Sequence, residues 1–187
     1  MSTAPLDQAV ATARAVLANI TPEQLDAPSP CASWKVADVI NHVIGGQHFF
    51  ATIMRGEQMQ GDAPNFAAGD YLAAFDTATS ACRNAFLADG AMERMIALPF
   101  GTMPGAAVVG IVATDTLTHA WDIAKATGQS TNLAPDLAEG LLQGVRGAIQ
   151  DSFRGEDGKA LFGPEREAPD NATNADRLAA FLGRDPT

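Results

Sequence analysis

The stretch Val108–Ala126, VVGIVATDTLTHAWDIAKA, decides the fold and carries the most informative side chains of the sequence. At about 100° per residue its apolar residues recur along one face, as in a helix that packs on a core. Asp115 and His119 lie on that same face, one turn apart and about 6 Å along the axis. Burial of both groups is costly unless a partner satisfies them, and a divalent metal ion is such a partner.

His42 is the candidate for a third ligand. It lies far upstream in a segment of helical periodicity, residues 35–55, on the face that it shares with Val39, Gly46, Phe49 and Ile53. Three N/O ligands with an open fourth position are typical of a catalytic zinc site, although nickel, iron or another first-row ion suits the same donors. The alternative is a core histidine that hydrogen-bonds to a carbonyl or a carboxylate.

Two further carboxylates lie close to these candidates on the helical wheels. Asp122 is within about 60° of His119, so it could replace Asp115 as the ligand. Alternatively, it could accept a hydrogen bond from a ligating histidine. Asp38 precedes His42 by one turn and could orient another group. We favour Asp115 as the ligand because a spacing of four residues matches His119 better.

A thiol and another histidine flank the candidate site. Cys31 lies just before residues 35–55, where it could supply a thiol near the site or pack as a small apolar side chain. Gly45 and Gly46 either allow close helix packing or leave room for a ligand beside His42. His48 is about 120° from His42 around the helix and is expected to flank the site without binding the metal.

Helical periodicity extends through nearly the whole chain, and no strand pattern of convincing length occurs. A Pro-rich connector, Ala27–Ala32, and Ser33 as the cap precede the second helix. The sequence therefore favours an all-α bundle with long crossover connections and a short C-terminal helix, in a single domain, residues 1–187. The helices are expected over residues 6–20, 35–55, 70–88, 106–126, 135–153 and 175–182.

Composition and charge argue against several classes of partner. Lys and Arg number 12 and Asp and Glu number 22, so the net charge is −10, and no basic cluster occurs that would bind nucleic acid. No apolar run is long enough for a membrane span, and the N-terminus does not have the pattern of a signal peptide. The two cysteines have no zinc-finger or disulfide spacing, which suits a reducing cytoplasm.

Four stretches of the sequence resemble the DinB-like metal-binding family, in the branch that contains the N-terminal domain of mycothiol-dependent maleylpyruvate isomerase. The segments W-x-x-x-D-x-x-x-H and D-x-x-x-H-x-W-D are the more specific part of the resemblance, which covers residues 6–186. The stretches are PCASWKVADVINHVIGG from Pro30, LPFG from Leu98, DTLTHAWDIAKATG from Asp115 and RLAAFLGRDP from Arg177.

The resemblance implies a four-helix core with a divalent metal held by His42, Asp115 and His119. It also implies that the metal binds or activates a low-molecular-weight thiol, such as mycothiol as a cosubstrate. The expected function is then a metal-dependent thiol transferase or isomerase that acts on a small electrophile. The alternative is a non-catalytic metal-binding bundle with a structural or stress-related role. The expected partners are a small-molecule substrate and the thiol. The sequence leaves open whether the chain forms a homodimer.

Overall fold

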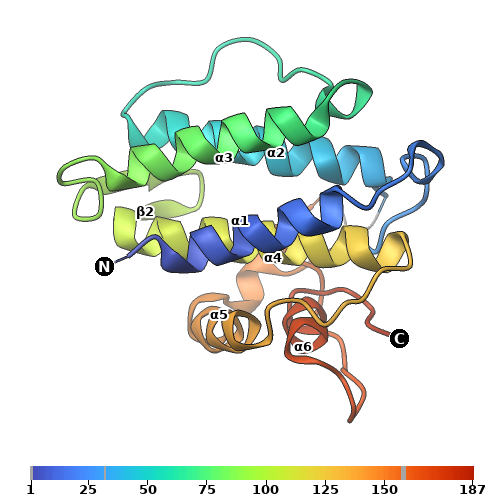
Figure 1. Cartoon of the computed structure of the whole chain (residues 1–187). Helices are drawn as coiled ribbons and strands as arrows, with labels where there is room; N and C mark the ends of the chain where they lie inside the picture. Colours follow the sequence, from blue (N-terminus) through green and yellow to red (C-terminus); the bar gives the residue numbers. More distant parts are fainter. Residues whose placement is uncertain (1, 32, 157–158) are drawn as a thin grey trace.

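Helices dominate the computed structural model, which describes residues 2–31, 33–156 and 159–187 (Figure 1). The all-α class is confirmed, with one short hairpin added to the helices. Ala32, at the end of the predicted Pro-rich connector, lies outside the described residues. The helices are α1 (Ala4–Leu17), α2 (Val36–Met54), α3 (Tyr71–Leu87), α4 (Gly105–Ala126), α5 (Pro135–Ala148) and α6 (Asn174–Phe181).

Helix α4 lies at the centre of the arrangement. The most extensive packing joins α1 to α4 and α2 to α3, and contacts of α2 with α4 and of α1 with α3 complete a four-helix bundle. Helices α5 and α6 pack on each other and against α4, outside the bundle (Figure 1). Because neighbours cover α4 on several sides, all of its residues from Thr116 to Ala124 are buried.

Side-chain caps fix where several helices begin. Asp70 accepts a hydrogen bond from the Ala73 N–H at the start of α3. At the start of α2 the structure places Lys35, and not the predicted Ser33, at the N-cap position. There the Asp38 carboxylate accepts a hydrogen bond of 3.0 Å from the backbone N–H of Lys35, which satisfies a donor at the helix start.

The hairpin of β1 (Met95–Leu98) and β2 (Gly101–Pro104) corrects the expectation from the sequence, which shows no strand pattern of convincing length. The two strands pair antiparallel just before α4. Ile96 and Leu98 are buried, whereas Met95 and Ala97 are exposed. A strand of four residues gives too short an alternation to be recognised beside two prolines. The tight connection uses Gly101 at a φ of +146°, which favours glycine.

The fifth helix is shorter than predicted. Helix α5 ends at Ala148 instead of residue 153, because Ile149 turns to an extended conformation with ψ of 114°. A single 3-10 turn, Asp151–Phe153, follows. Three glycines at positions 140, 144 and 147 weaken this helix, so its last turn is not maintained.

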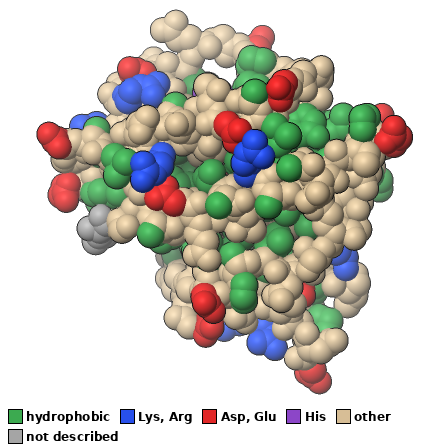
Figure 2. Space-filling view, viewed as in Figure 1, with side chains coloured by type: hydrophobic (Ala, Val, Ile, Leu, Met, Phe, Trp, Pro, Cys, Tyr) green, Lys and Arg blue, Asp and Glu red, His purple; other side chains and the backbone are tan. Residues whose placement is uncertain are grey.

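Charges are mixed over the surface. On the face in Figure 2, Lys and Arg side chains lie among Asp and Glu and do not gather into a patch. Two ion pairs, Arg14 with Asp76 and Arg83 with Asp7, join α1 to α3. Among the described residues, no helix is long and apolar enough to cross a membrane.

Candidate metal centre

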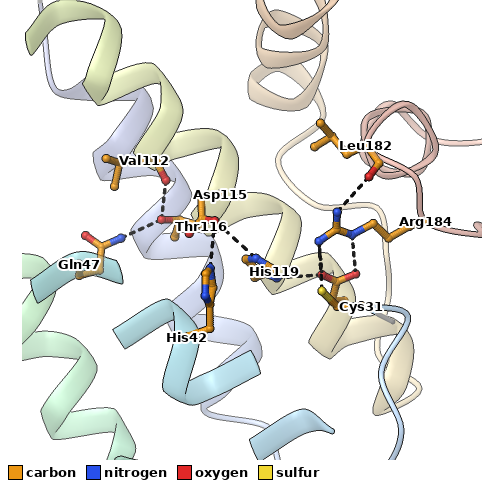
Figure 3. A network of polar contacts seen from close by, with 10 residues as sticks. Cys31, His42, Gln47, Val112, Asp115, Thr116, His119, Leu182 and Arg184 are labelled. Atoms are coloured by element: carbon orange, nitrogen blue, oxygen red, sulfur yellow. Dashed lines mark hydrogen bonds and ion pairs between the residues drawn. The ribbon is translucent and has the colours of Figure 1, made fainter. Parts of the chain in front are cut away.

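His42 of α2 and the pair Asp115 and His119 of α4 come together where these two helices pack (Figure 3). The Nε2 atom of His42 lies 3.2 Å from Oδ1 of Asp115. The Nε2 atom of His119 lies 3.4 Å from the same oxygen. The two imidazole centroids are 4.5 Å apart, and the three potential ligand atoms all lie within 4.8 Å of one another.

The spacing and the chemistry of these donors fit a divalent metal ion. Two ligand atoms that each lie about 2.0–2.1 Å from a tetrahedral zinc ion are separated by about 3.4 Å. The two distances from the Asp115 oxygen, 3.2 and 3.4 Å, are close to that separation. Two imidazole nitrogens and one carboxylate oxygen suit zinc and other first-row ions alike, so the geometry leaves the identity of the metal open.

One side of this site is accessible to solvent. The side chains of His42 and Asp115 are 38% and 29% exposed, whereas His119 is only 8% exposed. A Cβ added at Gly46 would meet only Oδ2 of Asp115, at 3.8 Å, and one at Gly45 would meet no atom within 4 Å. Gly46 therefore leaves room beside the Asp115 carboxylate, and Gly45 faces open space.

The other side of His119 is closed by a buried ion pair. Its Nδ1 lies 2.9 Å from Oδ2 of Asp122, which is completely buried. Arg184, beyond the end of α6, donates to both carboxylate oxygens of Asp122, from Nη2 at 3.1 Å and from Nε at 3.3 Å. A histidine that donates its Nδ1–H to a carboxylate keeps Nε2 free for a metal and cannot rotate away.

The charges around His119 shift the pKa values of Asp115, Asp122 and His119 itself. Burial would raise the pKa of Asp115, but the imidazoles of His119 and His42 hold this pKa well below its usual range. Burial would lower the pKa of His119, but Asp115, Asp122 and Cys31 raise it well above its ordinary value. Burial would raise the pKa of Asp122, and Arg184 and His119 lower it instead. The metal-free site thus favours a protonated His119 between two carboxylates.

Cys31 and Trp34 also reach the site from the segment before α2. The Sγ atom of Cys31 lies within 4.8 Å of ligand atoms of His119 and Asp122, and it accepts a hydrogen bond from Arg184 Nη2 at 3.5 Å. The Trp34 ring lies 4.9 Å from the ring of His42 and 5.8 Å from that of His119, centroid to centroid. An aromatic side chain therefore packs beside both candidate histidine ligands.

Asp38 and His48 lie away from these clusters. Asp38 caps the start of α2, as described above, which gives it a role in the helix and not beside the histidines. His48 stacks on Phe66 with a centroid distance of 5.7 Å. Together with Gly45, these two rings line a cavity of about 660 Å³ along α2. This cavity begins one helical turn from His42.

Sequence reasoning gave no role to Arg184 or to Gln47. The buried Gln47 donates to Thr116 Oγ1 at 2.8 Å, and Thr116 donates to the Val112 carbonyl, which fixes α2 against α4 beside Asp115. A buried Asp122 requires a cationic partner. The sequence could therefore predict that a Lys or Arg side chain lies beside it. The sequence could not choose Arg184 among 12 Lys and Arg residues.

The comparison with known families identifies the class of this fold. The sequence model of the mycothiol maleylpyruvate isomerase N-terminal domain matches residues 6–124, the span that holds all three candidate ligands. The chain belongs to this family. As a mycothiol maleylpyruvate isomerase N-terminal domain protein, it has the DinB-like helical bundle that the sequence predicted. Helices α5 and α6 and Arg184 lie beyond the matched residues.

Two relatives match most of the chain. Two proteins of Mycobacterium tuberculosis, from strains CDC 1551 / Oshkosh and ATCC 25618 / H37Rv, are each 41% identical over 170 residues. The similar region covers 91% of this chain and 90% of each relative, so it extends beyond the residues of the family match. Both relatives are described only as uncharacterized proteins. No solved structure matches the chain.

Proposed function

We propose that this protein binds one divalent transition-metal ion through Nε2 of His42, Oδ1 of Asp115 and Nε2 of His119. The observation that carries the proposal is the spacing of these atoms, because 3.2 and 3.4 Å are close to a tetrahedral separation. Zinc is the favoured ion, with nickel or iron as alternatives. The buried Asp122 supports His119 from behind, as carboxylates commonly do for metal-binding histidines.

We further propose that the site is catalytic and uses a low-molecular-weight thiol. Three protein ligands and a solvent-exposed side favour an open coordination position, whereas structural zinc sites usually have four protein ligands. A metal ion in this site would lower the pKa of a thiol or water at that position and give a nucleophile at neutral pH. The name of the family supports mycothiol as the cosubstrate.

The reaction proposed is thiol transfer to a small electrophile, or its thiol-assisted isomerisation. In this scheme Asp122 and Arg184 hold the His119 ring in place, and Trp34 shields one side of both imidazoles. The cavity lined by Gly45, His48 and Phe66 begins one helical turn after His42 along α2. It offers space for a small substrate. The non-catalytic alternative shares the ligands but predicts that no added thiol reaches the metal.

We propose that the working partners are small molecules in the cytoplasm and not nucleic acids or membranes. The net charge of −10 disfavours contact with a phosphate backbone. Both cysteines are free thiols, as expected for a reducing compartment. A mobility-shift assay with duplex DNA and RNA at physiological salt checks the first part, and binding there would contradict it.

Metal analysis and a thiol titration test the proposed function. Protein without a histidine tag should hold about one metal ion per chain after supplementation, and less than about a tenth of an equivalent would contradict the metal site. The Co(II) form should gain a thiolate-to-cobalt charge-transfer band when a low-molecular-weight thiol is added. Metal binding without any response to thiol would contradict the catalytic role and favour the structural alternative.

A further inference from the structure

The two histidines of the proposed metal centre are held in different ways. His119 belongs to two groups of potential ligands, one with His42 and Asp115 and the other with Cys31 and Asp122. In the second group, Nδ1 of His119 lies 2.9 Å from a carboxylate oxygen of Asp122, which fixes the ring. The Nε2 atom of His42 faces Asp115, but no residue in the part of the chain that the structure describes hydrogen-bonds to its Nδ1. The orientation of His42 therefore depends on another kind of contact.

The indole ring of Trp34 supplies this contact. Its centroid lies 4.9 Å from that of the His42 ring, with an angle of 48° between the two planes. It lies 5.8 Å from the centroid of the His119 ring, at an angle of 23°. Both distances are in the range of favourable aromatic pairs. Because the His42 side chain is 38% exposed, the indole limits the rotation of a ring that solvent alone leaves free.

Backbone hydrogen bonds fix Trp34 on the segment before α2. The Trp34 N–H donates to the Cys31 carbonyl at 3.1 Å, and the Trp34 carbonyl accepts from the Ser29 N–H at 2.9 Å. The next residue, Lys35, forms an antiparallel bridge with Pro28. The Trp34 side chain is partly buried against the hydrophobic core. The indole is thus anchored independently of the metal ligands and can hold a neighbouring ring in place.

We propose that Trp34 is a positioning residue that holds the His42 ring in its metal-binding orientation, as Asp122 does for His119. This inference rests on the proposed metal site of His42, Asp115 and His119. A ligand that is oriented before the ion arrives loses less freedom on binding, so the ion is bound more tightly. Removal of the indole should therefore weaken metal binding although all three ligands remain.

Metal titration of full-length variants tests the inference. Trp34→Leu should lower the affinity for Co(II) by about three- to tenfold, which corresponds to the loss of one aromatic contact. Trp34→Phe keeps a ring beside His42 and should bind Co(II) within about twofold of the wild type. Trp121→Phe is the matched control, because this tryptophan is buried and donates from Nε1 to Asp176. It should lower stability in urea unfolding and leave the affinity unchanged.

Three results of the titration would overturn the inference. The first is an affinity of Trp34→Leu within twofold of the wild type. The second is an equal loss in Trp34→Phe, because the ring contact is then not what holds His42. The third is an equal loss in Trp121→Phe, because the effect then follows general destabilisation of the fold. If circular dichroism shows that Trp34→Leu does not fold, Trp34→Met replaces it with the same expected loss.

NMR spectroscopy of the wild type gives a test that needs no variant. Nuclear Overhauser effects should join the indole protons of Trp34 to the ring protons of His42, both in the metal-free protein and after zinc is added. Their absence from the zinc-bound protein would overturn the inference, because the indole would then not contact His42 while this ring binds the metal.

Two outcomes separate this inference from the proposed function. If the wild type binds Co(II) and responds to an added thiol, and Trp34→Leu binds it equally well, the metal site stands and only the role of Trp34 fails. If neither the wild type nor any variant binds Co(II) or zinc, the proposed function fails, and the role of Trp34 at the metal fails with it.

Discussion

The two sides of the His119 ring differ in solvent exposure, in the space beside them and in how their charges are paired. On the Nε2 side, Asp115 and His42 are partly exposed, and glycines leave space beside them. On the Nδ1 side, Asp122 is completely buried and Arg184 nearly so, and every charged group has a protein partner. The first side has the properties of a binding site and the second those of a structural support.

The difference shows how two similar carboxylates on one helix acquire different roles. Asp115 and Asp122 are both close to His119 on α4. A buried carboxylate that is paired with arginine has its charge compensated and contributes to the fold. Asp115 is partly exposed between two imidazoles, with no arginine beside it, so a bound metal would also compensate its charge. We therefore expect changes on the first side to affect metal binding and changes on the second to affect stability as well.

The largest expected effect is the loss of metal on removal of either histidine. His42→Ala and His119→Ala should each lower the bound metal from about one equivalent to less than about a tenth, because two ligands alone hold such an ion weakly. His48→Ala is the control, since His48 stacks on Phe66 outside both ligand groups. Elemental analysis measures all three, and equal losses in all three would show that the two sides are wrongly assigned.

The next effect distinguishes the two carboxylates. Asp122→Asn should destabilise the fold by about 3 kcal/mol, because it leaves the buried Arg184 without its counter-charge. It should also weaken metal binding by about 10- to 100-fold through the loss of support for His119. Asp115→Asn should abolish tight metal binding and cost less stability than Asp122→Asn, because Asp115 is partly exposed and His119 keeps Asp122 as a partner. Urea unfolding of the metal-free proteins and metal titration check both, and similar stability losses would remove the distinction between the sides.

A pH dependence of metal binding sharpens the comparison further. The carboxylates on both sides raise the pKa of His119 in the metal-free protein, so a metal ion must displace a proton from it. Affinity should therefore fall as the pH is lowered, by about tenfold per pH unit for each displaced proton. Calorimetry in buffers of different ionisation enthalpy counts the released protons. An affinity that is independent of pH between 6 and 8, roughly the range in which histidines titrate, would contradict a protonated His119.

The smallest expected effect concerns the space beside Asp115. Gly46→Ala adds a Cβ that would lie 3.8 Å from the carboxylate, an ordinary contact. The variant should bind metal as the wild type does and gain up to about 1 kcal/mol of stability, because alanine favours a helix interior over glycine. Urea unfolding and metal titration measure the two quantities. A loss of metal binding would show that this side of the site has no spare room.

Local periodicity was sufficient to predict most of the helices and the faces of α2 and α4 that carry the candidate ligands. The apolar repeat of residues 108–126 placed Asp115 and His119 on one face of α4, and a similar repeat placed His42 on the inner face of α2. The hairpin of β1 and β2 was missed because its strands are too short to show a period. The end of α5 was misplaced because helix propensity alone does not mark where tertiary packing stops supporting a glycine-rich turn.

The sequence by itself determined the helical class, the family motifs and a short set of candidate ligands, His42 and His119 with Asp115 or Asp122, because all of these depend on spacing within one helix or one motif. The tertiary structure decided which side of His119 faces solvent and which is closed. Asp115 and Asp122 are alike on a helical wheel, and only the packing of α2 on one side and of the C-terminal segment on the other distinguishes them. The contact between Arg184 and Asp122 joins residues 62 positions apart, and no periodicity within a helix can encode a contact over that separation.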